Sequence, residues 1–134
     1  MGIFKTTRKV TDEEREFKTE NLKRLVNEFD ATEAIGEKKY KEAMQFIYDR
    51  KRKSFVVVAG PEKTFKLKNP YIVEFDQVRE AAVEIKGKNI FMKFTTKHPY
   101  AKKIRYKMNY KSVKNEDFSE YLEMADRISK VLSK

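Results

Sequence analysis

Residues 102–111, KKIRYKMNYK, alternate between basic and apolar side chains along most of their length. The apolar set consists of Ile104, Tyr106, Met108 and Tyr110, and the basic set of Lys103, Arg105, Lys107 and Lys111. Side chains on a strand point alternately to the two faces of a sheet, so a period of two is typical of a half-buried strand. We therefore expect residues 102–111 to form a strand with one face in the core and the other face basic.

Short apolar runs separated by turn residues extend this pattern toward the N-terminus. The stretches expected to form strands are 44–48, 55–59, 64–67, 71–75, 81–86 and 90–95. Residues 49–54 and 86–89 suit tight turns, because polar residues and glycine favour turn conformations. Residues 43–50 fit a helix as well as a strand, since the apolar residues 46–48 satisfy both spacings. The count is therefore six to seven short antiparallel strands.

Both ends of the chain carry helix signals. Thr11 followed by three acidic residues is typical of a helix N-terminus, and the apolar spacing beyond it predicts a helix to about Phe29. Its buried stripe is expected to consist of Leu22, Leu25, Val26 and Phe29. Near the other end, Asn115 can cap a second amphipathic helix. The buried stripe of that helix is expected to consist of Phe118, Tyr121, Leu122, Ala125, Ile128 and Leu132.

Residues 30–42 follow neither pattern clearly. Gly36 interrupts what could otherwise be a short second helix, so the structure of this stretch stays open. We divide the chain into an N-terminal helical extension, residues 1–42, and one compact unit, residues 43–134. The unit belongs to the α+β class, as a small antiparallel β-barrel or sandwich of six to seven strands with a C-terminal amphipathic helix.

The charge of the chain is unevenly distributed. Its 134 residues include 31 Lys and Arg against 21 Asp and Glu, which gives a formal net charge of +10, and no cysteine. The lack of cysteine excludes disulfide scaffolds and thiolate metal sites. Residues 85–115 contain ten basic residues and no acidic one. Such a segment favours an anionic partner.

Two groups of cations are candidates for binding an anionic ligand. The first is the turn Arg50, Lys51, Arg52 and Lys53, and the second is the strand set Lys93, Lys103, Arg105 and Lys107. Four cations on one turn can converge on a phosphate, although exposed turns are usually polar. A row of cations about 7 Å apart can follow a phosphate backbone or an anionic surface, or it can protect an edge strand from aggregation.

Other residue types give little support for catalysis. His98 is the only histidine, and no nucleophile or second metal ligand accompanies it in a recognisable motif. No phosphate-binding glycine loop occurs either. We therefore expect no catalytic residues, no metal site and no cofactor. Phe91 lies on the strand face opposite to Ile90 and Met92, beside Lys93, and is a candidate for stacking on a base or contacting a partner.

Three segments together resemble a bacterial pleckstrin-homology-like (PH-like) domain: FIYDRKRKSFVVV (46–58), YIVEFDQVREAAVEI (71–85) and FSEYLEMADRISKVL (118–132). The resemblance covers residues 43–134 and implies two sheets in a partly open barrel, with the C-terminal helix plugging one end. In eukaryotic members, basic residues in and beside the first hairpin hold phosphoinositide headgroups, which implies such a role for the turn 50–53. The chain lacks the tryptophan that is usual in the last helix of those members.

The sequence therefore predicts a non-enzymatic binding module that uses a basic sheet face and hairpin to bind an acidic partner protein or an anionic membrane surface. The alternative is a nucleic-acid-associated protein that binds phosphate backbone through the same residues. The longest apolar run, 55–59, is too short to span a membrane, and the first nine residues lack an apolar signal core. We expect a cytoplasmic protein, either free or peripheral at the inner membrane surface.

Overall fold

The computed structural model describes residues 11–40, 42–59 and 70–133, without the side chain of Asn115. The described residues form two long helices and seven strands. The helices are α1 (Asp12–Asn27) and α3 (Phe118–Leu132), and the strands are β1 (Glu33–Gly36), β2 (Met44–Asp49), β3 (Ser54–Ala59), β4 (Val73–Glu74), β5 (Val78–Lys86), β6 (Asn89–Thr96) and β7 (Lys103–Lys107). Two short 3-10 turns, η2 (Phe75–Gln77) and η3 (Asn115–Asp117), precede β5 and α3.

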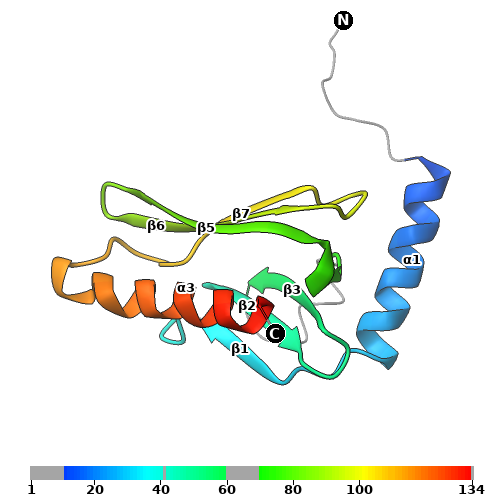
Figure 1. Cartoon of the computed structure of the whole chain (residues 1–134), viewed down its shortest axis with the longest axis horizontal. Helices are drawn as coiled ribbons and strands as arrows, with labels where there is room; N and C mark the ends of the chain where they lie inside the picture. Colours follow the sequence, from blue (N-terminus) through cyan, green and yellow to red (C-terminus); the bar gives the residue numbers. More distant parts are fainter. Residues whose placement is uncertain (1–10, 41, 60–69, 134) are drawn as a thin grey trace, which may run out of the picture.

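The strands form two separate antiparallel sheets. The first has the order β1-β2-β3-β4 and the second the order β5-β6-β7. Figure 1 shows the second sheet above the first, with α3 running beside both. α3 contacts β1 and β5, which are edge strands of the two sheets. The α+β class is thus confirmed, but no strand pairing among the described residues joins the sheets into a closed barrel.

The main core lies between the two sheets and α3. The rings of Phe46 and Phe55 stack with their centroids 4.7 Å apart, and Phe94 of the second sheet and Ile128 of α3 join the same cluster. All four side chains are essentially inaccessible to water. Burying each of them contributes about 2–3 kcal/mol, so this cluster stabilises the packing of the two sheets on each other and on α3.

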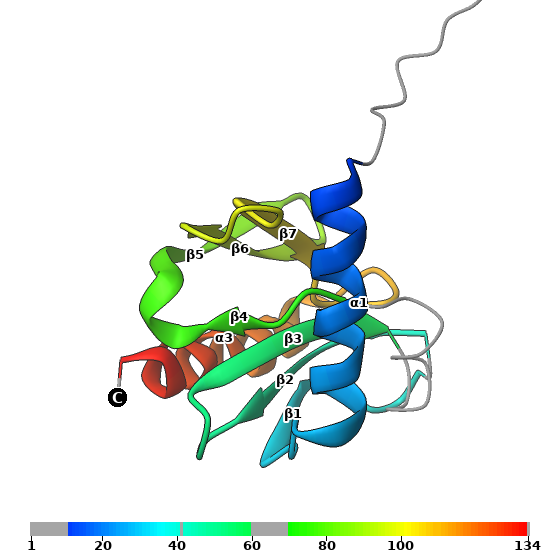
Figure 2. The ribbon, with the colours of Figure 1, turned by 90° about the vertical axis from the view of Figure 1, so that its right-hand side faces the viewer.

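A second apolar cluster lies on the other face of the first sheet, under α1. It contains Leu25, Ile47, Val56, Val58 and Ile72. Figure 2 shows α1 in front of the sheets, at the end of the molecule that is on the right in Figure 1. Because β3 is covered on both faces, its residues form a continuous apolar run and do not alternate.

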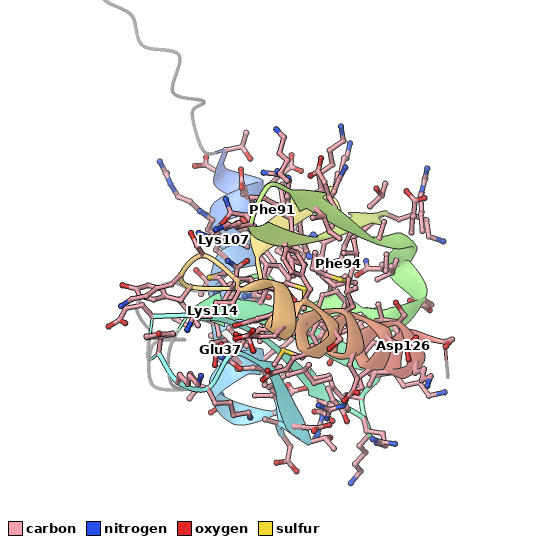
Figure 3. The ribbon with its side chains drawn as sticks, turned by 90° about the vertical axis from the view of Figure 1, so that its left-hand side faces the viewer. Glu37, Phe91, Phe94, Lys107, Lys114 and Asp126 are labelled. Carbon is pink, nitrogen blue, oxygen red and sulfur yellow. The ribbon has the colours of Figure 1, made fainter. Side chains whose placement is uncertain are left out.

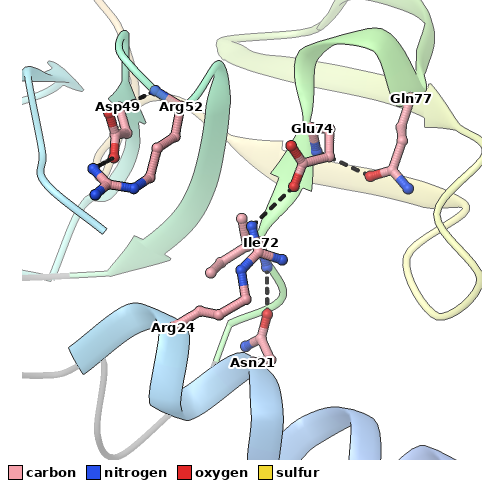
Figure 4. Close-up of polar contacts among 7 residues, drawn as sticks. All are labelled: Asn21, Arg24, Asp49, Arg52, Ile72, Glu74 and Gln77. Carbon is pink, nitrogen blue, oxygen red and sulfur yellow. Dashed lines mark hydrogen bonds and ion pairs between the residues drawn. The ribbon is translucent and has the colours of Figure 1, made fainter. Parts of the chain in front are cut away.

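Polar contacts hold α1 against the segment that leads into β4 (Figure 4). The side chain of Asn21 accepts a hydrogen bond from the backbone N–H of Ile72 at 2.8 Å and donates one to the carbonyl of Pro70 at 2.7 Å. The guanidinium of Arg24 lies 3.0 Å from the carboxylate of Glu74. These bonds satisfy backbone groups that no strand pairs, so α1 is part of the packed structure.

The stretch that the sequence left open, residues 30–42, contains the strand β1, and residues 44–49 form a strand as well. Gly36 is where β1 passes closest to β2. A Cβ atom at this position would lie 2.6 Å from Oε1 of Gln45 and 2.7 Å from the carbonyl oxygen of Met44. Gly36 therefore permits close strand pairing and does not mark the end of a helix.

The two predicted helices are confirmed, with corrections at their surfaces. The hydroxyl of Thr11 accepts a hydrogen bond from the N–H of Glu14 at 3.1 Å, as expected for the cap. The expected burial of Val26 and Leu122 is wrong, because they are 53% and 40% exposed. The N-terminal cap of α3 is Asp117, since the residues expected to begin the helix form the 3-10 turn η3.

Two expected strands differ from the structure. The strand expected at 102–111 ends at Lys107, and Tyr110 is exposed, not buried with the other apolar residues. Of the strand expected at 71–75, only Val73 and Glu74 pair, because the chain turns into η2. The strand expected at 64–67 lies outside the described residues. The number seven was thus expected, but β1 was not among the strands counted.

Neither helix of the described chain combines the length and apolar character that crossing a bilayer requires.

Candidate functional site

The outer face of the second sheet carries the strand cations that the sequence singled out. On β6 and β7 the inward side chains of Met92, Phe94 and Tyr106 are buried, whereas the residues between them point outward. We call the set Lys93, Lys103, Arg105 and Lys107 the basic sheet face. Lys93, Lys103 and Arg105 are exposed and Lys107 is half-buried. The strict alternation of the sequence therefore brings all four cations to one surface.

The strand register places these cations next to one another. Lys93 is directly opposite Arg105, and Phe91 is directly opposite Lys107. Figure 3 shows Phe91 and Lys107 close together on the second sheet. Directly opposed residues have Cβ atoms about 5 Å apart, and like charges at that distance destabilise a sheet. The Lys93–Arg105 pair thus concentrates positive charge where folding alone would disfavour it.

Two acidic residues of β5, Glu80 and Glu84, lie on the same outward face, and Glu84 pairs with Arg105. Nε of Arg105 donates a hydrogen bond to Oε1 of Glu84 at 3.0 Å, and the guanidinium lies 3.8 Å from the ring centroid of Phe91. The hydrogen bond from Arg105 lowers the pKa of Glu84 below its usual value, and the charges of Arg105, Lys93 and Lys86 act in the same direction. Arg105 is therefore held between Glu84 and the ring of Phe91, and its side chain remains 44% exposed.

The three lysines of the basic sheet face form no direct ion pair in the described part of the chain, although the charge of Lys93 acts on Glu84. Within residues 11–40, 42–59 and 70–133, no ion pair includes Lys93, Lys103 or Lys107. The face therefore has a net positive charge that is available to a partner. Glu84 is not among the site residues that the sequence predicts. The turn predicted at 86–89 could have identified it, because that turn sets Glu84 opposite Phe91.

The outward direction of Phe91 agrees with expectation, but its ring is not free. It is half-buried, and the Arg105 guanidinium covers it. A cation over an aromatic face is a favourable arrangement that a stacking base would have to displace. The position of Phe91 therefore supports the ordering of Arg105 more directly than it supports base stacking.

The cations of the turn 50–53 are used differently. The buried carboxylate of Asp49 accepts hydrogen bonds from the N–H of Asp30 at 2.9 Å and of Arg52 at 3.1 Å, and the Arg52 guanidinium lies 3.3 Å away (Figure 4). Burial by itself would raise the pKa of Asp49, but these bonds hold it below its usual value. Nη2 of Arg50 donates to the hydroxyl of Tyr48 at 2.9 Å. Two of the four cations thus stabilise the turn itself.

A cavity of about 230 Å³ lies between the turn and the last turns of α3. It is lined by Tyr48, Arg50, Lys53, Phe75, Lys130 and Val131. One of these residues, Lys53, has a backbone φ of +49°, a left-handed conformation that is unfavourable for a residue with a side chain. Two further features concern the charge of the cavity. The carbonyl groups at the C-terminal end of α3 repel anions, and Lys130 is already paired with Asp126 at 3.0 Å. These features make the cavity a weaker anion site than its cations suggest.

The structure places the two groups of cations on different sheets. The turn belongs to the first sheet and lies beside the end of α3, whereas the basic sheet face is the outer side of the second sheet (Figure 1). In addition, β1 precedes β2, so the turn 50–53 joins the second and third strands. The first hairpin of the structure turns within residues 37–43, where Lys38 and Lys39 are exposed.

His98 is a buried structural residue. Its ring packs against those of Phe17, Tyr71 and Tyr100, with centroids 5.2 to 6.4 Å away. Burial lowers the pKa of His98, although the nearby backbone of Ile72 favours the charged ring. No cluster of His, Asp and Glu among the described residues is suited to hold a metal ion.

Comparison of the chain with protein-family models, with curated proteins and with solved structures finds no match.

Proposed function

We propose that this protein is a non-enzymatic, PH-like binding module whose basic sheet face binds an anionic surface, either a membrane or an acidic protein. The observation that carries the proposal is the direct pairing of Lys93 with Arg105 on a face where Lys103 and Lys107 have no ion-pair partner in the described chain. A sheet that only needed solubility would place acids between these cations. Their accumulation is best explained by a partner that supplies the negative charge.

The arrangement of elements supports the PH-like part of the proposal. A sheet of four strands is followed by a sheet of three strands and then by a single long helix that packs between them. The resemblance of the sequence implies two sheets and a C-terminal helix that packs at one end of them, although the strand β1 lies outside the residues that it covers. The strand before the hairpin 46–58 means that the headgroup site of the eukaryotic members does not carry over directly to the turn 50–53.

The shape of the basic sheet face favours an extended anionic surface over a single phosphate. Cations along β7 are about 7 Å apart and cations on neighbouring strands are about 5 Å apart, which forms a flat array. Three lysines and one immobilised arginine at these spacings can each meet a different headgroup or carboxylate. Each contact is weak and screened by salt, so we expect moderate affinity that falls as the salt concentration rises.

The test is co-sedimentation with vesicles of phosphatidylcholine alone and of phosphatidylcholine with roughly 30 mol% phosphatidylserine, at low and physiological salt. We compare the wild type with Lys93→Glu/Lys103→Glu. The matched control is Lys51→Glu/Lys53→Glu, which changes the net charge by the same amount on the turn 50–53. We expect the sheet variant to lose binding to anionic vesicles about tenfold or more, and the turn variant to keep most of it.

Equal losses in the two variants would mean that net charge alone determines binding, and would overturn the proposal. Absence of binding to anionic vesicles at low salt would exclude the membrane. The same two variants would then be compared on immobilised poly-glutamate, which tests the acidic-protein form. Failure of both probes to distinguish the variants removes the basic sheet face as a binding surface.

Nucleic acid remains the second candidate, because the same cation spacing can follow a phosphate backbone. If the four residues of the basic sheet face each contact a phosphate of duplex DNA, the logarithm of the binding constant should fall with the logarithm of the salt concentration with a slope of about −3.6. A slope near zero, or binding that is unaffected by Lys93→Glu/Lys103→Glu, would exclude this reading.

A further inference from the structure

β5 is the longest strand of the described chain and an edge of the second sheet. Among the described residues, its only strand partner is β6. Two large apolar side chains on it, Val83 and Ile85, are 38% and 50% exposed. Long edge strands with exposed apolar residues readily pair with another strand, so proteins usually shorten or charge them. β5 is neither short nor uniformly charged, which calls for an explanation.

The direction of the backbone groups on β6 follows from two hydrogen bonds. The N–H of Ile90 donates to Oδ1 of Asn109 at 2.9 Å, and the N–H of Met108 donates to the carbonyl of Ile90 at 2.7 Å. The backbone of Ile90 thus points toward β7. Backbone groups of successive strand residues point in opposite directions, so those of Phe91 and Lys93 point toward β5.

The free backbone groups of β5 can then be assigned. Glu84 and Ala82 lie opposite Phe91 and Lys93 in the register and use their backbone groups to pair with β6. The N–H and C=O groups of Ala81, Val83 and Ile85 therefore point to the free edge. The exposed apolar side chains and the unpaired backbone groups belong to the same residues, so a strand that paired here would satisfy both.

The outward side chains of β5 show which strand fits. They run Glu80, Ala82, Glu84 and Lys86. We propose that two copies of this chain associate through their β5 edges in an antiparallel pair, with Val83 opposite Val83 of the second copy. Glu80 then faces Lys86 of the second copy, and the reverse pair forms by symmetry.

The apolar residues match in the same register, because Ala81 faces Ile85 of the second copy. Other registers are less favourable. Moving the pair so that Val83 faces Ala81 would set Glu80 against Glu84, and moving it so that Val83 faces Ile85 would set Glu84 against itself. Like charges directly opposite one another destabilise a sheet, so the charge pattern selects the register centred on Val83.

α3 provides a second reason to favour this side of the molecule. It runs beside β5 (Figure 1), and its Leu122 is exposed. Arg127 of α3 pairs with Glu33 of β1, and Leu122 lies about 140° round the helix from it, on the side away from β1. A second copy would cover Leu122 together with Val83 and Ile85. The two second sheets would then form one six-stranded sheet with a continuous basic outer face.

The association is expected to be weak, since an edge-to-edge contact is small. Sedimentation velocity from about 10 to 300 µM is therefore the suitable measurement. We expect a reversible monomer–dimer equilibrium for the wild type. Residues 80 and 86 face each other at two places in the symmetric dimer. Glu80→Lys sets two lysines against each other at both places, and Lys86→Glu sets two glutamates against each other. Each variant should weaken the dimer about tenfold.

Complementation makes the test specific for the register. An equimolar mixture of the Glu80→Lys chain and the Lys86→Glu chain restores both ion pairs, so it should form a heterodimer with an affinity near that of the wild type. The double variant Glu80→Lys/Lys86→Glu should also dimerise. Matched controls are Glu28→Lys and Lys51→Glu, which make the same charge changes at exposed sites away from β5 and should leave the equilibrium unchanged.

A third variant, Val83→Lys, removes the central apolar contact at a position that is already partly exposed. It should abolish the dimer without changing the midpoint of thermal unfolding measured on the monomer. A wild type that stays monomeric at every concentration overturns the proposal. A dimer that Val83→Lys leaves intact, or charge variants that do not complement each other, would also overturn it. None of these readouts depends on anion binding, so this proposal can fail or hold independently of the function proposed above.

Discussion

The turn 50–53 and the basic sheet face each contain four cations, but the fold uses them in opposite ways. In the turn, Arg52 pairs with the buried Asp49 and Arg50 bonds to Tyr48. On the sheet face only Arg105 has an ion-pair partner among the described residues. Two cations of the turn thus stabilise the turn itself, whereas three lysines of the basic sheet face can interact with a partner.

The reason for the difference is geometric. In a tight turn, an acid three residues before a cation lies within reach of it, as Asp49 does of Arg52. In a strand, neighbours on the same face are about 7 Å apart, and a compensating acid must come from the adjacent strand. Neither β6 nor β7 supplies an acid to this face, and of the two acids that β5 brings to it, Glu80 and Glu84, only Glu84 reaches a cation of the set, Arg105, across β6. A count of basic residues in the sequence therefore does not measure the charge that a partner can use.

The largest effect is expected from removing Asp49, the acid whose hydrogen bonds hold the turn 50–53 together. Asp49→Ala leaves the N–H groups of Asp30 and Arg52 without their acceptor and frees the Arg52 guanidinium. We expect a loss of about 3 kcal/mol in the free energy of unfolding, measured by urea denaturation. Asp49→Asn keeps an acceptor and should cost less. Loss of below about 0.5 kcal/mol for Asp49→Ala would show that the turn does not depend on this carboxylate.

As the pH falls, the region around His98, directly after β6, should lose stability before the turn 50–53 does. The pKa of the buried His98 is lowered in the folded state, so the unfolded chain binds the proton more tightly and stability is lost as the pH falls below about 6.5. We expect the free energy of unfolding to decrease between pH 7.5 and 5.5, by at most about 1.4 kcal/mol, the limit that the unfolded-state pKa sets.

Hydrogen exchange locates this effect. Protection factors should fall in residues 97–101 and not in residues 49–54, because the lowered pKa of Asp49 keeps that carboxylate ionised throughout this range. His98→Gln should flatten the pH dependence even if it lowers stability overall. A pH dependence that persists unchanged in His98→Gln would assign the titration to another group.

Lys53→Gly examines the strain in the turn. The left-handed φ of +49° is unfavourable for lysine and suits glycine. We expect the variant to be stabilised by about 0.5 kcal/mol in urea denaturation and to bind anionic vesicles as well as the wild type does. The control Lys51→Gly, at a neighbouring position without positive φ, should be destabilised. Weaker vesicle binding by Lys53→Gly would mean that the turn belongs to the binding surface.

The smallest expected effect concerns Glu84, the acid of the sheet face that pairs with Arg105. Glu84→Gln removes a negative charge beside Arg105 and keeps a hydrogen-bond acceptor. If the basic sheet face binds anionic vesicles, the variant should bind about two- to threefold more tightly at low salt. Glu80→Gln, which removes the same charge from the same strand without a contact to Arg105, is the control. A decrease in binding for Glu84→Gln would show that orientation of Arg105 matters more than net charge.

Much of the fold could be predicted because the signals are local. The cap at Thr11, the hairpin between β2 and β3, and the alternation in β7 each depend on residues that are adjacent in the sequence. The strand β1 could not be found in this way. It has only four residues, and its place beside β2 depends on a close backbone approach at Gly36 that no short-range pattern reveals.

Some features of the candidate site could also be predicted from local sequence patterns, and others could not. Alternation was sufficient to predict that Lys103, Arg105 and Lys107 share a face, because a strand sends every second residue to the same side. The partnership of Arg105 with Glu84 and Phe91 depends on which strands are neighbours and in what register. The exposure of Val83, Ile85 and Leu122 also depends on neighbours, since an edge strand or helix face is recognised only when nothing packs against it.

The sequence by itself determined the α+β class, the cations of the second sheet and the local structure of its helix and hairpin ends, since short-range periodicity and capping carry that information. Only the tertiary structure decided which charges are compensated and which edges are free. Those properties come from contacts between residues far apart in the chain, such as Arg24 with Glu74 and Glu84 with Arg105. The energy of such contacts depends on a distance and a burial that folding alone creates.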